Sequence, residues 1–148
     1  MTNEPVTPHD RPAVNVSLLA VRVVVGVIFA AHGAQKLLGA FEGPGLAATV
    51  KMMGPIAYPV AIGEFFGGLG LVVGFLCRFS AASLIVIMLG AIGKVHGAKG
   101  FFLQQGGFEY NLALIGLLIP ILIAGPGRYA VGRFLPKSKS GRTLVVLE

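Results

Sequence analysis

Hydrophobic residues fall into four long runs along the chain, separated by polar or glycine- and proline-rich segments. The runs cover residues 17–38, 58–76, 79–96 and 109–124. Apolar runs of roughly 20 residues are long enough to cross the hydrocarbon core of a bilayer as α-helices. These runs also lack the broad polar face of an amphipathic helix from a soluble protein. The pattern therefore predicts an all-α fold, an integral membrane four-helix bundle.

The remaining segments suggest how the chain is organised. Residues 1–16 are polar and rich in proline, which is typical of a disordered leader. The four runs define a transmembrane domain over residues 17–129, and the segment Gly125-Pro126-Gly127 marks its last helix stop. Residues 130–148 then form a basic tail.

Glycine content and proline positions predict the connections between the helices. Residues 39–55 and 97–108 are glycine-rich loops, and the first contains a short helix around residues 46–53. The dipeptide Cys77-Arg78 predicts a tight turn that makes the second and third helices antiparallel neighbours. Pro120 is expected to kink the fourth helix or to end its regular part.

Composition and charge agree with a membrane protein. Hydrophobic residues make up 55% of the chain and charged residues only 12%, against roughly 25% charged residues in soluble domains. The net charge of +6 does not indicate nucleic acid, because no binding motif accompanies it. Instead, the bases concentrate near the C-terminus, at Arg128, Arg133, Lys137, Lys139 and Arg142.

The positions of lysine and arginine predict the orientation in the membrane. Cytoplasmic loops carry an excess of these residues. The leader, the turn at Arg78 and the tail hold most of them, whereas the two glycine-rich loops hold Lys51, Lys94 and Lys99. We therefore expect both termini in the cytoplasm of a bacterial cell, with the chain crossing the inner membrane several times and both glycine-rich loops facing outward.

Small residues at four-residue spacing predict close helix packing. Such pairs let helix backbones approach each other in lipid, where van der Waals packing contributes strongly to association. The pairs are Gly26 and Ala30, Gly63 and Gly67, and Gly70 and Gly74. They favour a tight bundle over a wide pore.

Ionisable residues inside a membrane helix are costly and are functional candidates by default. His32 and Lys36 lie four residues apart, so they share one helix face. On straight helices, Glu64 of the second run lies almost level with His32 in the outer half of the bilayer. Arg22 is in the inner half, where it is expected to snorkel toward water.

Further polar residues map to the same outer half of the bundle. His96 ends the third run, and Glu109 and Tyr110 begin the fourth. Together with His32, Lys36 and Glu64 they predict one polar pocket that opens outward. A carboxylate, an imidazole and an ammonium group there could transfer protons and hold a polar ring. Alternatively, Glu64 pairs with Lys36 or His32 and only locks the first helix to the second, since buried charges must be paired.

The sequence offers little for a metal or a redox thiol. The two histidines and Glu64 could ligate a metal or haem iron, but no pair of them has the spacing that places two ligands on one helix face, so we expect no metal site. Cys77 is the single cysteine, and we expect a small apolar residue at a helix end rather than a reactive thiol.

An ordered set of short motifs resembles the DoxX family of bacterial membrane proteins over about residues 16–129. The set comprises Arg22-x3-Gly26, His32-Gly33-x2-Lys36-Leu37, Gly63-Glu64 with Gly67-Gly68, Gly74-x3-Arg78, Gly100-Phe101-Phe102, Gly106-Gly107-x-Glu109-Tyr110 and Gly125-Pro126-Gly127-Arg128-Tyr129. The chain departs from this pattern after Tyr129, where the family's acidic residue is missing.

The resemblance implies four transmembrane helices and a quinone- or quinol-linked oxidoreductase, or a subunit of a membrane redox complex. In that case Glu64 and His32 would move protons and Lys36 would stabilise the negative charge of a partly reduced quinone. The substrate would be held by His96, Glu109, Tyr110 and Phe102. No electron carrier is evident in the chain, so such a protein needs a membrane or soluble redox partner, or a bound cofactor.

Two other functions stay open besides catalysis. The first is a non-catalytic anchor or assembly subunit, whose basic tail holds a soluble redox enzyme at the membrane. The second is a small transporter, which the lack of a visible inverted repeat disfavours. The sequence does not define the oligomeric state, and a homo-oligomer is compatible with it.

Overall fold

The protein is all-α, as the hydrophobic pattern predicts. The structure, a computed structural model, describes residues 12–134. Its α-helices are α1 (Pro12–Leu38), α2 (Gly45–Met53), α3 (Ala57–Val73), α4 (Cys77–Ala91) and α5 (Glu109–Ala124). Short 3-10 helices cover Gly54–Ile56, Gly97–Lys99, Leu103–Gln105 and Val131–Phe134, and a π-helix, Ile92–His96, continues α4. The helices α1, α3, α4 and α5 correspond to the four predicted runs, and α2 is the predicted short helix.

The helices have the length and composition of membrane spans. In the described part of the chain, three helical stretches are long and apolar enough to cross a bilayer: Pro12–Leu38, Gly45–Val73 and Cys77–Lys99. The second stretch joins α2 and α3 through a 3-10 turn. The helix α5 is also apolar but has only 16 residues, a rise of about 24 Å. The chain is therefore a multi-pass integral membrane protein.

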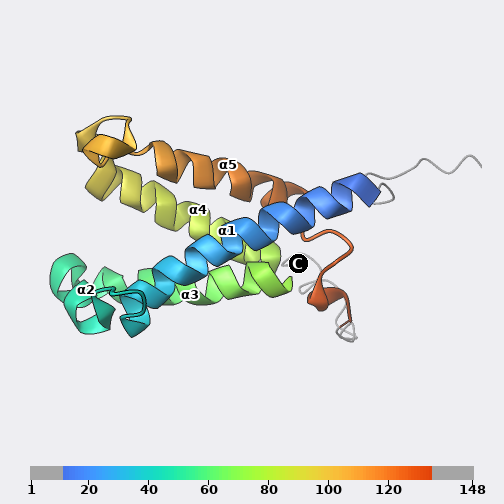
Figure 1. Cartoon of the computed structure of the whole chain (residues 1–148), viewed down its shortest axis with the longest axis horizontal. Helices are drawn as coiled ribbons and strands as arrows, with labels where there is room; N and C mark the ends of the chain where they lie inside the picture. Colours follow the sequence, from blue (N-terminus) through green and yellow to red (C-terminus); the bar gives the residue numbers. More distant parts are fainter. Residues whose placement is uncertain (1–11, 135–148) are drawn as a thin grey trace, which may run out of the picture.

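The four long helices pack as two antiparallel pairs, as Figure 1 shows. The first pair is α1 with α3, the second is α4 with α5, and α3 also packs against α4. The helix α2 and the loop between α4 and α5 lie at the same end of the bundle (Figure 1), which we call the α2 end. The turn between α3 and α4 and the segment after α5 lie at the opposite end. If the charge-based prediction holds, the α2 end faces outward.

The contact between α1 and α3 is close enough to require glycine. A Cβ atom on Gly33 would lie 2.2 Å from the backbone nitrogen of Phe65, and one on Gly68 would lie 2.4 Å from that of Ala30. Gly26 likewise approaches the carbonyl oxygen of Gly68. The predicted pair of Gly26 and Ala30 therefore does bring backbones together, by the packing of small residues that membrane helices use.

Two other predicted small residues face a different helix. A Cβ atom on Gly63 would lie 2.9 Å from the end of the Ile87 side chain, and one on Gly67 would lie 3.4 Å from the Leu84 side chain. Both partners belong to α4. The helix α3 thus uses one small-residue face against α1 and another against α4, and this explains its central position.

The first helix starts earlier than predicted. Residues 12–16 are assigned to the leader by their polarity, but α1 already includes Pro12. Proline is well suited to the first turn of a helix, because its missing N–H is not needed there. Asn15 is buried, and its Oδ1 accepts a hydrogen bond of 2.8 Å from the backbone N–H of Arg128. The predicted leader residues 1–11 and tail residues 135–148 lie outside the described residues.

The tight turn between α3 and α4 lies a few residues before its predicted position. The helix α3 ends at Val73, and Gly74 adopts a left-handed conformation with φ of 81°. Leu76 also has a positive φ of 50°, and Cys77 is the first residue of α4 rather than part of the turn. Cys77 is fully buried, so the prediction of a small apolar residue at a helix end is confirmed.

Arg22 does not snorkel toward water, contrary to the prediction. It is only 1% exposed. Its Nη1 donates to the carbonyl oxygen of Pro126 at 2.8 Å, and its Nη2 donates to that of Tyr129 at 2.6 Å. We call this arrangement the Arg22 latch. The physical reason for the error is that a planar guanidinium can satisfy two carbonyls at once, and these carbonyls come from a distant segment that folds back onto α1.

The latch fixes the segment that follows α5 across the end of the bundle opposite the α2 end. The helix α5 continues through Pro120 and ends at Ala124, followed by Gly125 with a φ of 81°. Ala130 is buried, and the N–H of Gly132 donates to the carbonyl of Gly74 at 3.1 Å. The predicted stop at Gly125-Pro126-Gly127 is therefore confirmed, and the residues beyond it close that end of the bundle.

Candidate functional site

An open, mostly apolar groove with a few polar groups lies between α1 and α5, and we refer to it as the cavity. It measures about 320 Å³ and is lined by Val27, Ile28, Ala31, His32, Gln35, Phe41 and Tyr110. The spacing of the α1 residues, three or four apart, places them on one face of that helix. Tyr110 comes from the first turn of α5, and Phe41 comes from the loop that follows α1.

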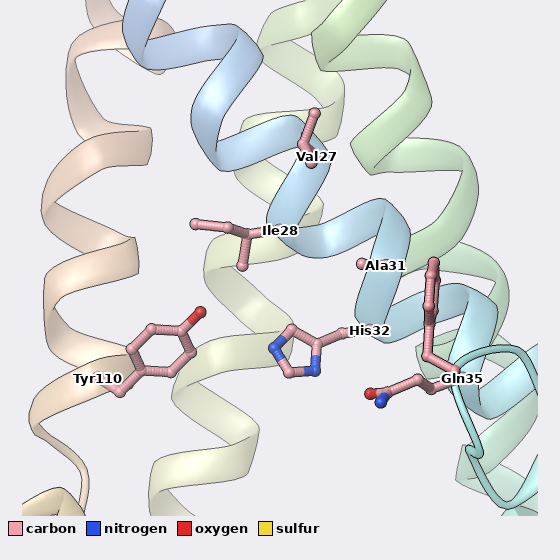
Figure 2. Close-up of a pocket in the computed structure, with 7 residues that line it drawn as sticks. Val27, Ile28, Ala31, His32, Gln35 and Tyr110 are labelled. Carbon is pink, nitrogen blue, oxygen red and sulfur yellow. The ribbon is translucent and has the colours of Figure 1, made fainter.

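His32 and Tyr110 face each other across this cavity, as Figure 2 shows. Their ring centroids are 6.3 Å apart, and the ring planes meet at 63°. Within residues 12–134, neither ring has a hydrogen bond to another residue. The imidazole and the phenol hydroxyl are therefore both available to a molecule in the cavity. Figure 2 also shows the Gln35 amide one turn farther along α1.

Lys36 and Glu64 form an ion pair that links α1 to α3. Nζ of Lys36 donates to Oε2 of Glu64. The Glu64 side chain is 3% exposed and that of Lys36 is 26% exposed. Neither residue lines the cavity, although Lys36 lies one helical turn beyond His32. The pair thus has the geometry of the helix lock, one of the two interpretations that the sequence leaves open.

His96, Glu109 and Phe102 all belong to the loop between α4 and α5 or to its borders. Nδ1 of His96 donates to the carbonyl oxygen of Gly106 at 2.7 Å. Oε1 of Glu109 accepts a hydrogen bond of 2.6 Å from the backbone N–H of Leu103. These contacts hold the loop in shape and do not point either side chain into the cavity.

Aromatic contacts add to the order of the same loop. The ring of Phe101 meets the rings of Phe102 and Phe108 edge to face, with centroids 5.4 Å and 5.5 Å apart. Phe102 is exposed and does not line the cavity. The sequence assigns six ionisable and phenolic residues to one pocket, but the structure divides them among the cavity, the Lys36–Glu64 ion pair and the loop between α4 and α5. Of these three arrangements, only the cavity has room for a ligand beside its polar groups.

Two residues of the cavity, Gln35 and Phe41, are not among the site residues predicted from the sequence. Gln35 is a neutral residue beside the more conspicuous Lys36, and Phe41 is one of many aromatic residues near a predicted helix end. Gln35 shares the helix face of His32, so periodicity around His32 indicates it once that histidine is taken as the centre. Phe41 reaches the cavity through the conformation of its loop, which no periodicity reveals.

The cavity's donor set suits hydrogen bonding better than metal binding. In the described residues, no group of three or more histidine, cysteine, aspartate or glutamate side chains could hold a metal ion. The cavity itself offers one imidazole, one phenol and one carboxamide. Few polar groups in an apolar wall are typical of sites for small organic molecules. The structure thus defines a class: a multi-pass membrane protein with an apolar cavity that presents an imidazole, a phenol and a carboxamide.

The chain belongs to the DoxX family. The family model, described as DoxX, matches residues 17–97, which span α1 through the π-helix after α4. No solved structure matches the chain. The family assignment therefore rests on sequence, and it agrees with the resemblance seen in the motifs.

Three bacterial relatives are similar over most of their length. One is an uncharacterized membrane protein of Mycobacterium tuberculosis, 29% identical over 82% of this chain and 82% of its own. Another is the inner membrane protein YqjF of Escherichia coli, 28% identical over 83% of this chain and 95% of its own. A third, from Bacillus subtilis, is named "Putative oxidoreductase CatD" and is 30% identical over 84% of this chain and 90% of its own.

Proposed function

We propose that this protein takes part in membrane redox chemistry on a quinone or quinol, as an oxidoreductase or as a subunit of one. The observation that carries the proposal is the pairing of His32 and Tyr110 across an apolar cavity within the membrane-spanning helices. The name of the Bacillus subtilis relative supports the reaction class. The family membership supports the membrane location.

The cavity offers the kinds of group that a quinone ring would contact. A quinone has a flat apolar ring with an oxygen on opposite sides, and usually a hydrocarbon tail that keeps it in the bilayer. The volume of about 320 Å³ lies at the lower end of the range for small-molecule sites. His32, Tyr110 and Gln35 can hydrogen-bond to ring oxygens, and the aliphatic wall of Val27, Ile28 and Ala31 can contact the ring and the tail.

The polar side chains have separate roles in proton transfer and in charge stabilisation. Reduction of a quinone to a quinol takes up two electrons and two protons. The His32 imidazole can pass a proton to one ring oxygen, and the Tyr110 hydroxyl can hydrogen-bond to the second oxygen. Lys36 lies one turn from His32, and its ammonium group can stabilise negative charge on a partly reduced ring. Glu64 holds the Lys36 side chain in that position.

The electrons must come from another protein or from a cofactor held with one. The described residues offer hydrogen-bonding and charged groups at this site but no electron carrier, so we propose a redox partner with a haem, flavin or iron–sulfur centre. With both termini in the cytoplasm, the cavity lies in the outer half of the membrane. Protons then exchange with the side that the α2 end faces.

Binding of a quinone to the purified protein tests this proposal. The protein is placed in phosphatidylcholine nanodiscs, and the affinity for a decyl-tailed benzoquinone is measured by native mass spectrometry. We expect saturable binding by the unaltered protein. His32→Ala and Tyr110→Phe are each expected to weaken the affinity about tenfold, because a lost hydrogen bond costs roughly 1.4 kcal/mol. Gly90→Ala is the control, because a Cβ atom there meets nothing within 4 Å. Absence of binding by the unaltered protein refutes the proposal.

A non-catalytic anchor or assembly subunit is the second candidate. The Lys36–Glu64 pair favours it, because two of the three residues expected to be catalytic neutralise each other between α1 and α3. On this view the polar residues only hold the bundle together while another protein does the chemistry. Deletion of residues 137–148 from the basic tail is then expected to release that partner in a pull-down and to leave the bundle folded.

A further inference from the structure

The loop between α1 and α2 has an unusual backbone. Gly39 and Gly45 have positive φ values of 72° and 69°, which glycine adopts readily. Between them, Phe41 and Glu42 have φ values of 51° and 58°. A side chain with a Cβ atom is strained in this region, and a bulky one such as phenylalanine is rarely found there. In the described residues only Leu76 shares this property.

The loop is held in this conformation by close contact with α1. A Cβ atom on Gly43 would lie 2.6 Å from the Cα and the carbonyl oxygen of Gln35, so the loop folds back tightly onto the helix. The N–H of Ala40 donates to the carbonyl of Ala34 at 3.3 Å, and that of Gly43 donates to the carbonyl of Ala40 at 2.9 Å. The return of the loop therefore ends beside a residue that lines the cavity.

The helix α2 braces the loop from its other side. Thr49 is buried, and its hydroxyl donates to the carbonyl of Gly45 at 2.7 Å and approaches that of Lys36 at 3.3 Å. Lys36 lies in the last turn of α1, where carbonyl groups lack partners within the helix. Both ends of the loop are thus anchored to α1.

The result of this anchoring is the position of one aromatic ring. Phe41 is 73% exposed, yet it forms part of the cavity wall. A phenylalanine at a membrane helix end satisfies its apolar ring by contact with lipid, so no strain is needed to place it on the surface. Here two consecutive strained residues keep the ring at the cavity. Strained backbone conformations persist only where the surrounding structure imposes them, and they are found more often at sites that hold ligands.

We propose that Phe41 is a specificity-determining residue whose ring packs on the face of a planar ligand bound in the cavity, with the polar edge of the ligand toward His32 and Tyr110. The proposal rests on the proposed quinone site and adds the basis of selection to it. A flat ring offers its face to Phe41 and its edge oxygens to the hydrogen-bonding groups, whereas a puckered ring with the same oxygens loses the aromatic contact.

A planar, unsaturated probe and a puckered, saturated probe with the same two carbonyls test the role of Phe41. One is a decyl-tailed benzoquinone, and the other is the cyclohexane-1,4-dione with the same tail, which keeps both carbonyls but is not flat. Affinities are measured by native mass spectrometry in phosphatidylcholine nanodiscs. We expect the unaltered protein to prefer the planar probe by about two- to twelvefold, the range for an aromatic ring pair. Phe41→Leu loses this preference, and Phe41→Tyr keeps it.

Two further variants separate the ring from other effects. Gly43→Ala leaves Phe41 in place in the sequence but forces the loop away from Gln35, so it is expected to reduce the preference as Phe41→Leu does. Phe79→Leu alters an exposed phenylalanine of α4 that is not part of the cavity, and it is expected to change nothing.

The outcomes distinguish this inference from the proposed function. If Phe41→Leu still prefers the planar probe as strongly as the unaltered protein does, the role of Phe41 is refuted, and the quinone site stands because the planar probe still binds. Equal binding of both probes by the unaltered protein also refutes the role of Phe41 and leaves the quinone site standing. If the unaltered protein binds neither probe, the quinone site itself is refuted and the role of Phe41 with it.

Discussion

Replacing Lys36 by methionine leaves the buried carboxylate of Glu64 without its partner. The methionine has a similar length and removes only the charge. An ionised group at 3% exposure loses its hydration without compensation, and breaking one side of a buried pair typically costs about 3–5 kcal/mol.

The reverse replacement is expected to cost much less. In Glu64→Gln the lysine remains, but its side chain is 26% exposed and can extend toward the membrane surface. We therefore expect Lys36→Met to lower the free energy of unfolding by about 3 kcal/mol and Glu64→Gln by about 1 kcal/mol. The double variant removes both charges and is expected to lie within about 1 kcal/mol of the original protein, as for other buried pairs replaced together.

Unfolding in detergent with increasing fractions of sodium dodecyl sulfate, followed by circular dichroism, gives these free energies. Equal losses in the two single variants would contradict the view that an uncompensated carboxylate is the cause.

Three further predictions concern packing, the Arg22 latch and the loop at the α2 end. Gly33→Ala places a Cβ atom on the backbone of α3 and is expected to cost about 1–3 kcal/mol in the same unfolding assay, whereas Gly90→Ala is expected to be neutral or slightly stabilising. Arg22→Lys keeps the charge but cannot span two carbonyls, so trypsin is expected to cleave after Arg128 several times faster; an unchanged rate would mean that the latch does not hold this segment. Glu109→Ala removes the acceptor of a loop N–H, and hydrogen exchange at that amide is expected to rise by about fivefold, equivalent to roughly 1 kcal/mol.

The hydrophobic pattern predicts the helices well because membrane spans leave a strong local signal. The fourth run matches α5 at both ends, and the glycine-rich segments contain the predicted connections and α2. The errors occur where a distant segment decides the outcome. Asn15 and Arg22 are predicted from their polarity to lie in water or to reach it, but both are buried by contacts with residues 126–129.

The candidate site was only partly predictable for a related reason. Depth in the membrane places His32 and Tyr110 in the same half of the bundle, and they do meet. Depth alone does not tell which face of a helix a side chain occupies relative to its neighbours. The close approach of α1 and α3 at Gly33 directs Glu64 toward Lys36 and away from the cavity. Phe41 depends on a strained loop, for which no helical or strand periodicity exists.

The packing of α1 on α3 has a consequence for how the protein is made. These helices precede α4 and α5 in the chain, and their mutual contacts are among the closest in the bundle. Lys36 and Glu64 belong to this same pair, so each charge can meet its partner before α4 and α5 pack onto the bundle. We expect the first helical hairpin to enter the bilayer as a unit in which the two charges already neutralise each other. The second hairpin can then be added to a preformed surface.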